Sequence, residues 1–170
     1  GTAQGTTITA TTAFAPDAQD GAAIGTSSLQ FSDLFLADEA VVSFGDDNEI
    51  TLTHVADVGL TLTHTAAGDN KPIILNLKSE EDDITVGEVI GTINFQTPDE
   101  SSSGDSRLVA AGIEAVAEQT FSSTANTTRL KFKTAVSETA TEKMTILSGG
   151  NVGIGTAAPS ELLHIASTGD

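Results

Sequence analysis

The stretch that decides the fold lies at residues 148–165 and reads SGGNVGIGTAAPSELLHI. Its opening glycines and Asn151 supply the positive-φ backbone that a tight turn needs. Val152 and Ile154 alternate with glycines, so the expected strand has one apolar face and one face without side chains. A bare face lets another backbone approach closely, which suits chains that pack about a shared axis. Pro159 has no N–H to donate and ends the pairing before a second short apolar run.

The composition describes a chain with few large side chains for a core. Its 170 residues include 7 Phe but no Trp, Tyr or Cys. Small and β-branched residues suit strands that stack on identical copies better than they suit a self-sufficient core. Without Cys there are no disulfides and no thiolate metal sites. Because no run of about 18 apolar residues occurs, we expect no membrane insertion.

The net charge of −17 comes from 24 acidic and 7 basic residues. A surface of this sign repels the phosphates of nucleic acids and the headgroups of anionic membranes. We therefore expect neither of them as a partner. Salt or divalent cations would screen the charge of any assembly of several copies.

The first half of the chain carries a short internal repeat. Residues 49–54 alternate between apolar and polar side chains, which is typical of a half-buried strand. The tetrapeptide Thr-Leu-Thr-His occurs at residues 51–54 and again at 61–64. A spacing of ten residues equals one short strand plus one turn, the period of a β-meander or of a stacked rung. Residues 29–36 hold the largest apolar cluster, with two Phe and three Leu.

The second half contains a further series of expected strands. Residues 108–118 are rich in Ala and Glu, which favours a helix. The alternation of apolar residues there, together with Gly112, favours a strand instead. The strands expected in this half are residues 73–77, 88–95, 108–118, 130–134 and 142–147.

These patterns divide the chain into four parts. Residues 1–20 form an N-terminal extended segment, 21–66 a first β module, 67–147 a second β module, and 148–170 a glycine-rich C-terminal strand segment. The sequence begins at Gly1 without Met, a basic segment or an apolar h-region, so it does not resemble a signal peptide. We expect it to belong to a longer chain.

Three segments resemble building blocks of bacteriophage tail fibres. Residues 150–165 resemble the form GNVGIGT-x-x-P-x-x-x-L-H-V, which often precedes a C-terminal chaperone domain. Residues 20–54 resemble D-G-x-x-x-G-x-x-x-x-x-F-x-D-L-F-L-A-D followed by G-D-D-x-x-x-T-L-T-H. Residues 89–146 carry, in order, V-x-G-x-I-x-F, I-E-A, L-x-F-x-T and T-E-x-M-x-I. It is the order of these pieces over residues 20–165 that makes the resemblance specific.

The resemblance implies a fibre or spike on a virion. Such a protein would associate with other virion structural proteins and contact a glycan or protein on the host surface. Residues 1–170 contain no such chaperone domain, so its self-cleaving Ser/Lys chemistry is carried over to none of them.

The histidines and carboxylates are the candidates for chemistry. His54 and His64 occupy equivalent places in the repeat and could form a metal ring about a threefold axis; the favoured alternative is that both simply end strands. His164 is the third histidine. Glycan-cleaving enzymes use paired carboxylates, and acidic clusters occur at residues 46–47, 80–83 and 99–100. All three lie at turn or loop positions, and the chain has no Trp or Tyr to form a sugar platform. We expect no catalytic residue, no metal site and no cofactor.

The sequence therefore predicts an all-β, elongated and modular protein of short strands, with a β-meander, β-prism or β-helix-like architecture. We expect it to form an intertwined parallel homotrimer that serves as a structural virion fibre in host attachment. A glycan-hydrolysing tailspike, a capsid-attached fibre and a bacterial surface adhesin stay open as alternatives. The residues expected in the interior of the trimer are Leu29, Phe31, Leu34, Phe35, Phe44, Leu52, Leu62, Ile74, Ile93, Phe95, Phe132, Met144, Ile146, Val152 and Ile154.

Overall fold

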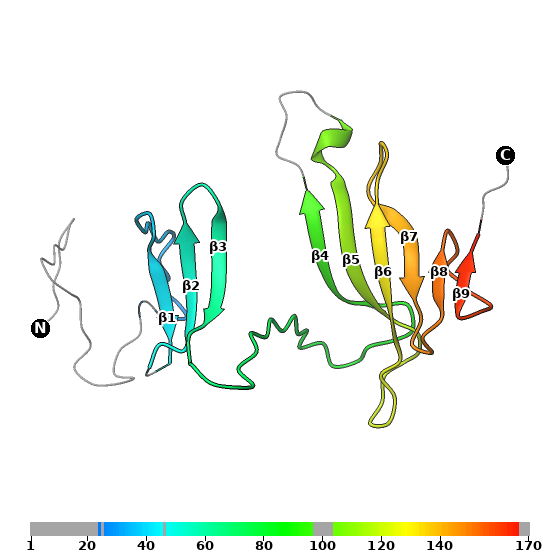
Figure 1. Cartoon of the computed structure of the whole chain (residues 1–170), viewed down its shortest axis with the longest axis horizontal. Coiled ribbons are helices and arrows are strands. Elements are labelled where there is room, and N and C mark those ends of the chain that lie inside the picture. Colours follow the sequence, from blue (N-terminus) through cyan, green and yellow to red (C-terminus); the bar gives the residue numbers. More distant parts are fainter. Residues whose placement is uncertain (1–23, 25, 46, 97–103, 167–170) are drawn as a thin grey trace, which may run out of the picture. The chain divides into compact units, whose positions relative to one another are not determined.

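The computed structural model describes residues 24, 26–45, 47–96 and 104–166 (Figure 1). Within these ranges the regular elements are β-strands and one short 3-10 turn, which confirms the all-β class. The chain divides into two compact units, residues 1–74 and 75–170. The expected N-terminal segment, 1–20, lies outside the described residues. No helix in the described ranges is long and apolar enough to cross a membrane.

The first unit holds a three-stranded antiparallel meander. Its strands follow in chain order, β1 (Val41–Phe44), β2 (Ile50–Val55) and β3 (Gly59–His64). The two Thr-Leu-Thr-His repeats pair with each other, with Leu52 opposite Leu62. Asp57 and Gly59 have positive φ at the turn between β2 and β3. The repeat is therefore a hairpin of a meander rather than a stacked rung.

Most of the apolar residues of this sheet share one face. Opposite residues on paired strands lie on the same side of a sheet, and Val42 pairs with Leu52, which pairs with Leu62. The hydroxyl-bearing residues Thr51 and Thr63 pair on the other face. Leu34, Leu36, Val42, Leu52 and Leu60 line a shared hollow.

The apolar cluster at residues 29–36 forms no strand and no buried core. Phe35 is 93% exposed, and Leu29, Phe31 and Leu34 are also exposed. Burial of these side chains would need a second layer, and the described part of the chain does not provide one.

The second unit is a six-stranded sheet whose strands are also in chain order (Figure 1). The pairs from β4 to β8 are antiparallel, and β8 pairs with β9 in parallel. Four of the five strands expected between residues 67 and 147 are present, including the one at residues 108–118. The elements are β4 (Val89–Gln96), the 3-10 turn η1 (Asp105–Arg107), β5 (Val109–Ala117), β6 (Thr128–Thr134), β7 (Thr141–Ile146), β8 (Val152–Ile154) and β9 (Leu163–Ile165).

The prediction of a strand at residues 73–77 is wrong. This segment has no regular structure, and Ile73, Ile74 and Leu75 are exposed. An apolar, β-branched run favours extended backbone, but a strand also needs a neighbour with which to pair. Leu77 instead lies over Gly91 of β4, so this segment contributes a side chain to the sheet and not a strand.

The glycine-rich stretch folds back on itself. Gly150 has a φ of 89° in the turn before β8, as expected from the sequence. A Cβ added at Gly153 would lie 2.3 Å from the carbonyl oxygen of Thr156 and 3.3 Å from Cδ of Pro159. Gly153 thus permits a close backbone approach, as its sequence indicates. The approaching backbone belongs to the same chain and not to another copy.

We predict that Gly153→Ala destabilises the second unit by about 1–3 kcal/mol, because the added methyl group forces the 156–159 turn off the sheet. The free energy of unfolding from urea titration measures the effect. Gly149→Ala is the matched control, since a Cβ at Gly149 meets no atom within 4 Å. Equal stability of the two variants would contradict the close packing of this turn.

Candidate functional site

One face of the six-stranded sheet is apolar from edge to edge. The cross-strand pairs align Ile93, Ile113, Phe132, Met144, Ile154 and Ile165 in one row through all six strands. A second row of paired residues runs beside it, from Gly91 on β4 to Leu163 on β9. We call this surface the apolar face. Its members are Gly91, Ile93, Phe95, Ala111, Ile113, Ala115, Leu130, Phe132, Met144, Ile146, Val152, Ile154, Leu163 and Ile165.

The apolar face is the more exposed side of the sheet. Phe95 is 56% exposed and Ile165 is 64% exposed. The buried residues Glu114, Val116 and Thr145 alternate with these apolar positions and point to the other side. This is the reverse of the usual sheet, in which the apolar side chains are covered and the polar ones face water.

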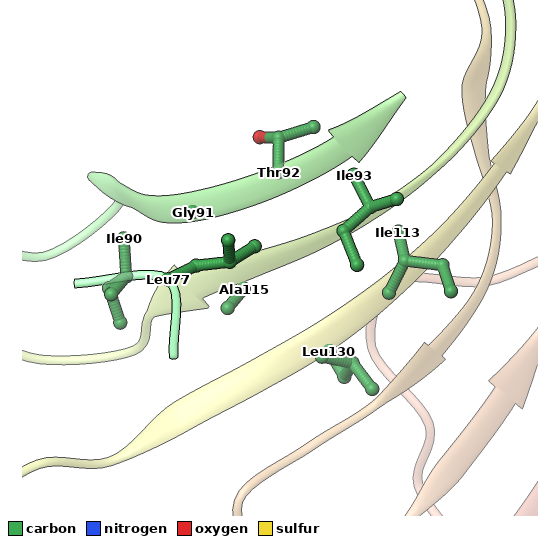
Figure 2. A pocket seen from close by; sticks show the side chains of 8 residues that line it. All are labelled: Leu77, Ile90, Gly91, Thr92, Ile93, Ile113, Ala115 and Leu130. Carbon is green, nitrogen blue, oxygen red and sulfur yellow. The ribbon is translucent and has the colours of Figure 1, made fainter. Parts of the chain in front are cut away.

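Leu77 covers a small part of the apolar face. It lies with Ile90 at a hollow of about 160 Å³ over Gly91, Ala115 and Leu130 (Figure 2). In the same view Ile93 and Ile113 point to this side of the sheet, whereas Thr92 points to the opposite side. The hollow therefore has an apolar lining and opens on the exposed face.

The opposite face holds a cluster of ion pairs. Lys133 Nζ donates to Glu114 Oε2 at 2.9 Å. Lys131 Nζ lies 3.4 Å from Glu114 Oε1 and 3.6 Å from Glu142 Oε2. These four side chains are 12–21% exposed. Strands β5, β6 and β7 thus share a charge-neutral network on a face that side chains largely shield from water.

The surroundings of Glu114 lower its pKa below the usual 4.5. Burial by itself raises this pKa, because it disfavours the charged form. The hydrogen bond from Lys133 and the charges of Lys133 and Lys131 outweigh burial. A lowered pKa in the folded state means that the carboxylate stabilises the fold above the usual pKa. That contribution is lost as the pH falls through the folded-state value.

We predict that Glu114→Gln lowers the free energy of unfolding by about 1–3 kcal/mol at pH 7, because both lysines lose their charged partner. The difference from wild type should shrink as the pH falls from 4.5 through the lower folded-state pKa of Glu114, because the wild-type carboxylate then also becomes neutral. Urea titrations at a series of pH values measure it. Glu80→Gln is the control, since Glu80 pairs with Lys78 on the surface at 85% exposure and should leave stability unchanged. A pH-independent difference would rule out this role for Glu114.

His54 and His64 do not pair with each other across the hairpin. His54 pairs with Leu60 and His64 with Ile50, so they occupy opposite ends of the hairpin. His54 Nδ1 lies 3.6 Å from Asp38 Oδ1, and His164 Nδ1 accepts a hydrogen bond from the Ser160 N–H at 3.4 Å. In the part of the chain that the structure describes, no three His, Cys, Asp or Glu side chains could together hold a metal ion.

The described residues of the acidic clusters form no carboxylate pair in a cleft. A hydrogen bond with Glu49 lowers the pKa of Asp47, an exposed residue in the turn before β2. Residues 80–83 lie in an exposed segment without regular structure. Asp46 and residues 99–100 lie outside the described residues.

Sequence reasoning missed the ion-pair network and the uneven exposure of the two sheet faces. Alternation in β5 and β6 was evident, and it places Glu114 and Lys131 on the polar side of their strands. That these residues meet depends on the register that puts Glu114 opposite Lys131. A search for opposite charges on consecutive alternating strands could have found the pair.

Comparison with protein-family models finds no match for this sequence, and comparison with curated proteins also finds none. The apolar face is the feature of the described residues that most needs a functional explanation.

Proposed function

We propose that this protein is a structural fibre of a virion, of the bacteriophage tail-fibre or spike type, that assembles as a homotrimer and takes part in host attachment. The observation that carries the proposal is the exposed apolar face of β4–β9. The resemblance of residues 20–165 to tail-fibre building blocks supplies the virion and the host surface as its setting. The contact on the host would be a surface glycan or protein.

Assembly is supported by the energetics of the sheet. Burial of a large aliphatic or aromatic side chain contributes about 1.5–3 kcal/mol. Ile93, Phe95, Ile154 and Ile165 remain 41–64% exposed in the single chain, so about half of that contribution is not realised. A single-layer sheet gains stability when a second layer covers its apolar face. Copies of the same chain provide such a layer.

The ion pairs of Glu114 and Glu142 support a role in attachment rather than in catalysis. Glu114 and Glu142 are both engaged by Lys131, so neither is an unpaired acid or base. A tailspike that hydrolyses glycans would need a free pair of carboxyl groups on either side of the sugar bond. Release of reducing ends from host polysaccharide would favour that alternative.

The test of the proposed function combines mass with location. We expect light scattering of the full chain to give three times the monomer mass, and an unboiled SDS gel to show a band that boiling converts to monomer. Antibodies against the chain should then label a fibre on virions. A stable monomer, or virions without label, would overturn the proposal.

We predict that Ile154→Asp lowers the fraction of trimer at least tenfold, because a carboxylate on the apolar face would be buried without a partner. Val136→Asp is the matched control. Val136 is also apolar and is 90% exposed, but it lies in the loop between β6 and β7. Light scattering of both variants at one concentration measures the effect. Equal trimer fractions would show that Ile154 stays in water in the assembly.

A further inference from the structure

The apolar face carries a recess at one end of β4. Gly91 and Ala115 lie opposite each other and have no side chain or only a methyl group. The hollow above them measures about 160 Å³, and its walls are Leu77, Ile90, Ile93, Ile113 and Leu130. A Cβ added at Gly91 would have only Leu77 Cβ within 4 Å, at 3.7 Å. Apolar cavities of about 150 Å³ accept a benzene ring, so the recess has the size and lining for an aromatic side chain.

The same strand carries a protruding aromatic residue. Phe95 lies on the apolar face opposite Ala111, whose small side chain does not cover it. Phe95 is 56% exposed. It is four residues along β4 from Gly91, about 13 Å at about 3.3 Å per residue. Phe95 therefore cannot fill the recess of its own sheet.

The absence of charge on the apolar face permits a second copy of the chain as the occupant. Each copy carries a net charge of −17, so identical copies repel each other over most of their surfaces. The members of the apolar face include no charged residue. Two copies can approach there without opposing carboxylates. The protrusion and the recess lie at different places on the face, so identical copies can join head to tail, and such contacts form a ring where the rotation closes.

We propose that Phe95 of one copy inserts into the recess over Gly91 and Ala115 of the next copy. This inference rests on the proposed homotrimer, in which three such contacts close a ring. Each chain then donates one phenyl ring and receives one. The contact fixes which face of the sheet lies inside the assembly and the alignment of neighbouring β4 strands.

Disulfide trapping tests the contact, since the wild-type chain has no Cys. In the full-length double variant Gly91→Cys/Phe95→Cys, the two positions of one chain are too far apart to join, because a disulfide needs Cα atoms within about 7 Å. Any disulfide therefore links different copies. After mild oxidation we expect a covalent trimer on a denaturing, non-reducing gel, and its conversion to monomer by a thiol.

The control is Thr92→Cys/Asn94→Cys on the same strand. Thr92 pairs with Glu114 and Asn94 with Gly112, which places both on the opposite face, so this variant should stay monomeric on the gel. Circular dichroism of each variant checks folding. If Gly91→Cys prevents folding, Ala115→Cys with Phe95→Cys places the thiol in the same recess from β5.

Light scattering of wild type separates the outcomes. A trimer in solution with no covalent species from either double variant would overturn this contact and leave the homotrimer standing. A covalent dimer alone would support the contact and overturn the closed ring of three. A monomer in solution would overturn both.

Discussion

A single-layer sheet with one apolar face has to bury that face, and this constraint governs the second unit of the protein. Fourteen positions on six strands, the members of the apolar face, present a continuous surface with no charge. Backbone pairing organises these strands, but it contributes little to net stability because water can also satisfy the same groups. The main driving force for burial is therefore available only once another layer is added.

The face opposite the apolar face is stabilised by contacts within a single chain. The ammonium groups of Lys131 and Lys133 on β6 pair with Glu114 on β5, and that of Lys131 also with Glu142 on β7. The turn at residues 156–159 packs on Gly153 from the same unit. One side of the sheet is thus well covered by its own strands and turns. The uncovered side is the one that lacks charge.

Assembly through the apolar face is consistent with the distribution of charge. Lysines neutralise the carboxylates of the network, and the fourteen members of the apolar face carry no charge. The assembly that we propose should therefore depend on apolar burial for its affinity and on salt only for the screening of distant repulsion.

The sequence by itself determined the strands whose side chains alternate, because the alternation reflects which face of each strand meets water. β2, β4, β5, β6 and β7 were predictable for this reason, and so was the turn at Gly150. Residues 73–77 show the limit of such reasoning: an apolar run indicates an extended backbone, but only the tertiary structure decides whether a neighbouring strand pairs with it. The same holds for Glu114, whose partners depend on the register between β5 and β6, and for Gly153, whose bare face is met by a turn of its own chain. Pattern along one strand is local, whereas register, close approach and the exposure of a whole face arise from contacts between segments distant in the sequence.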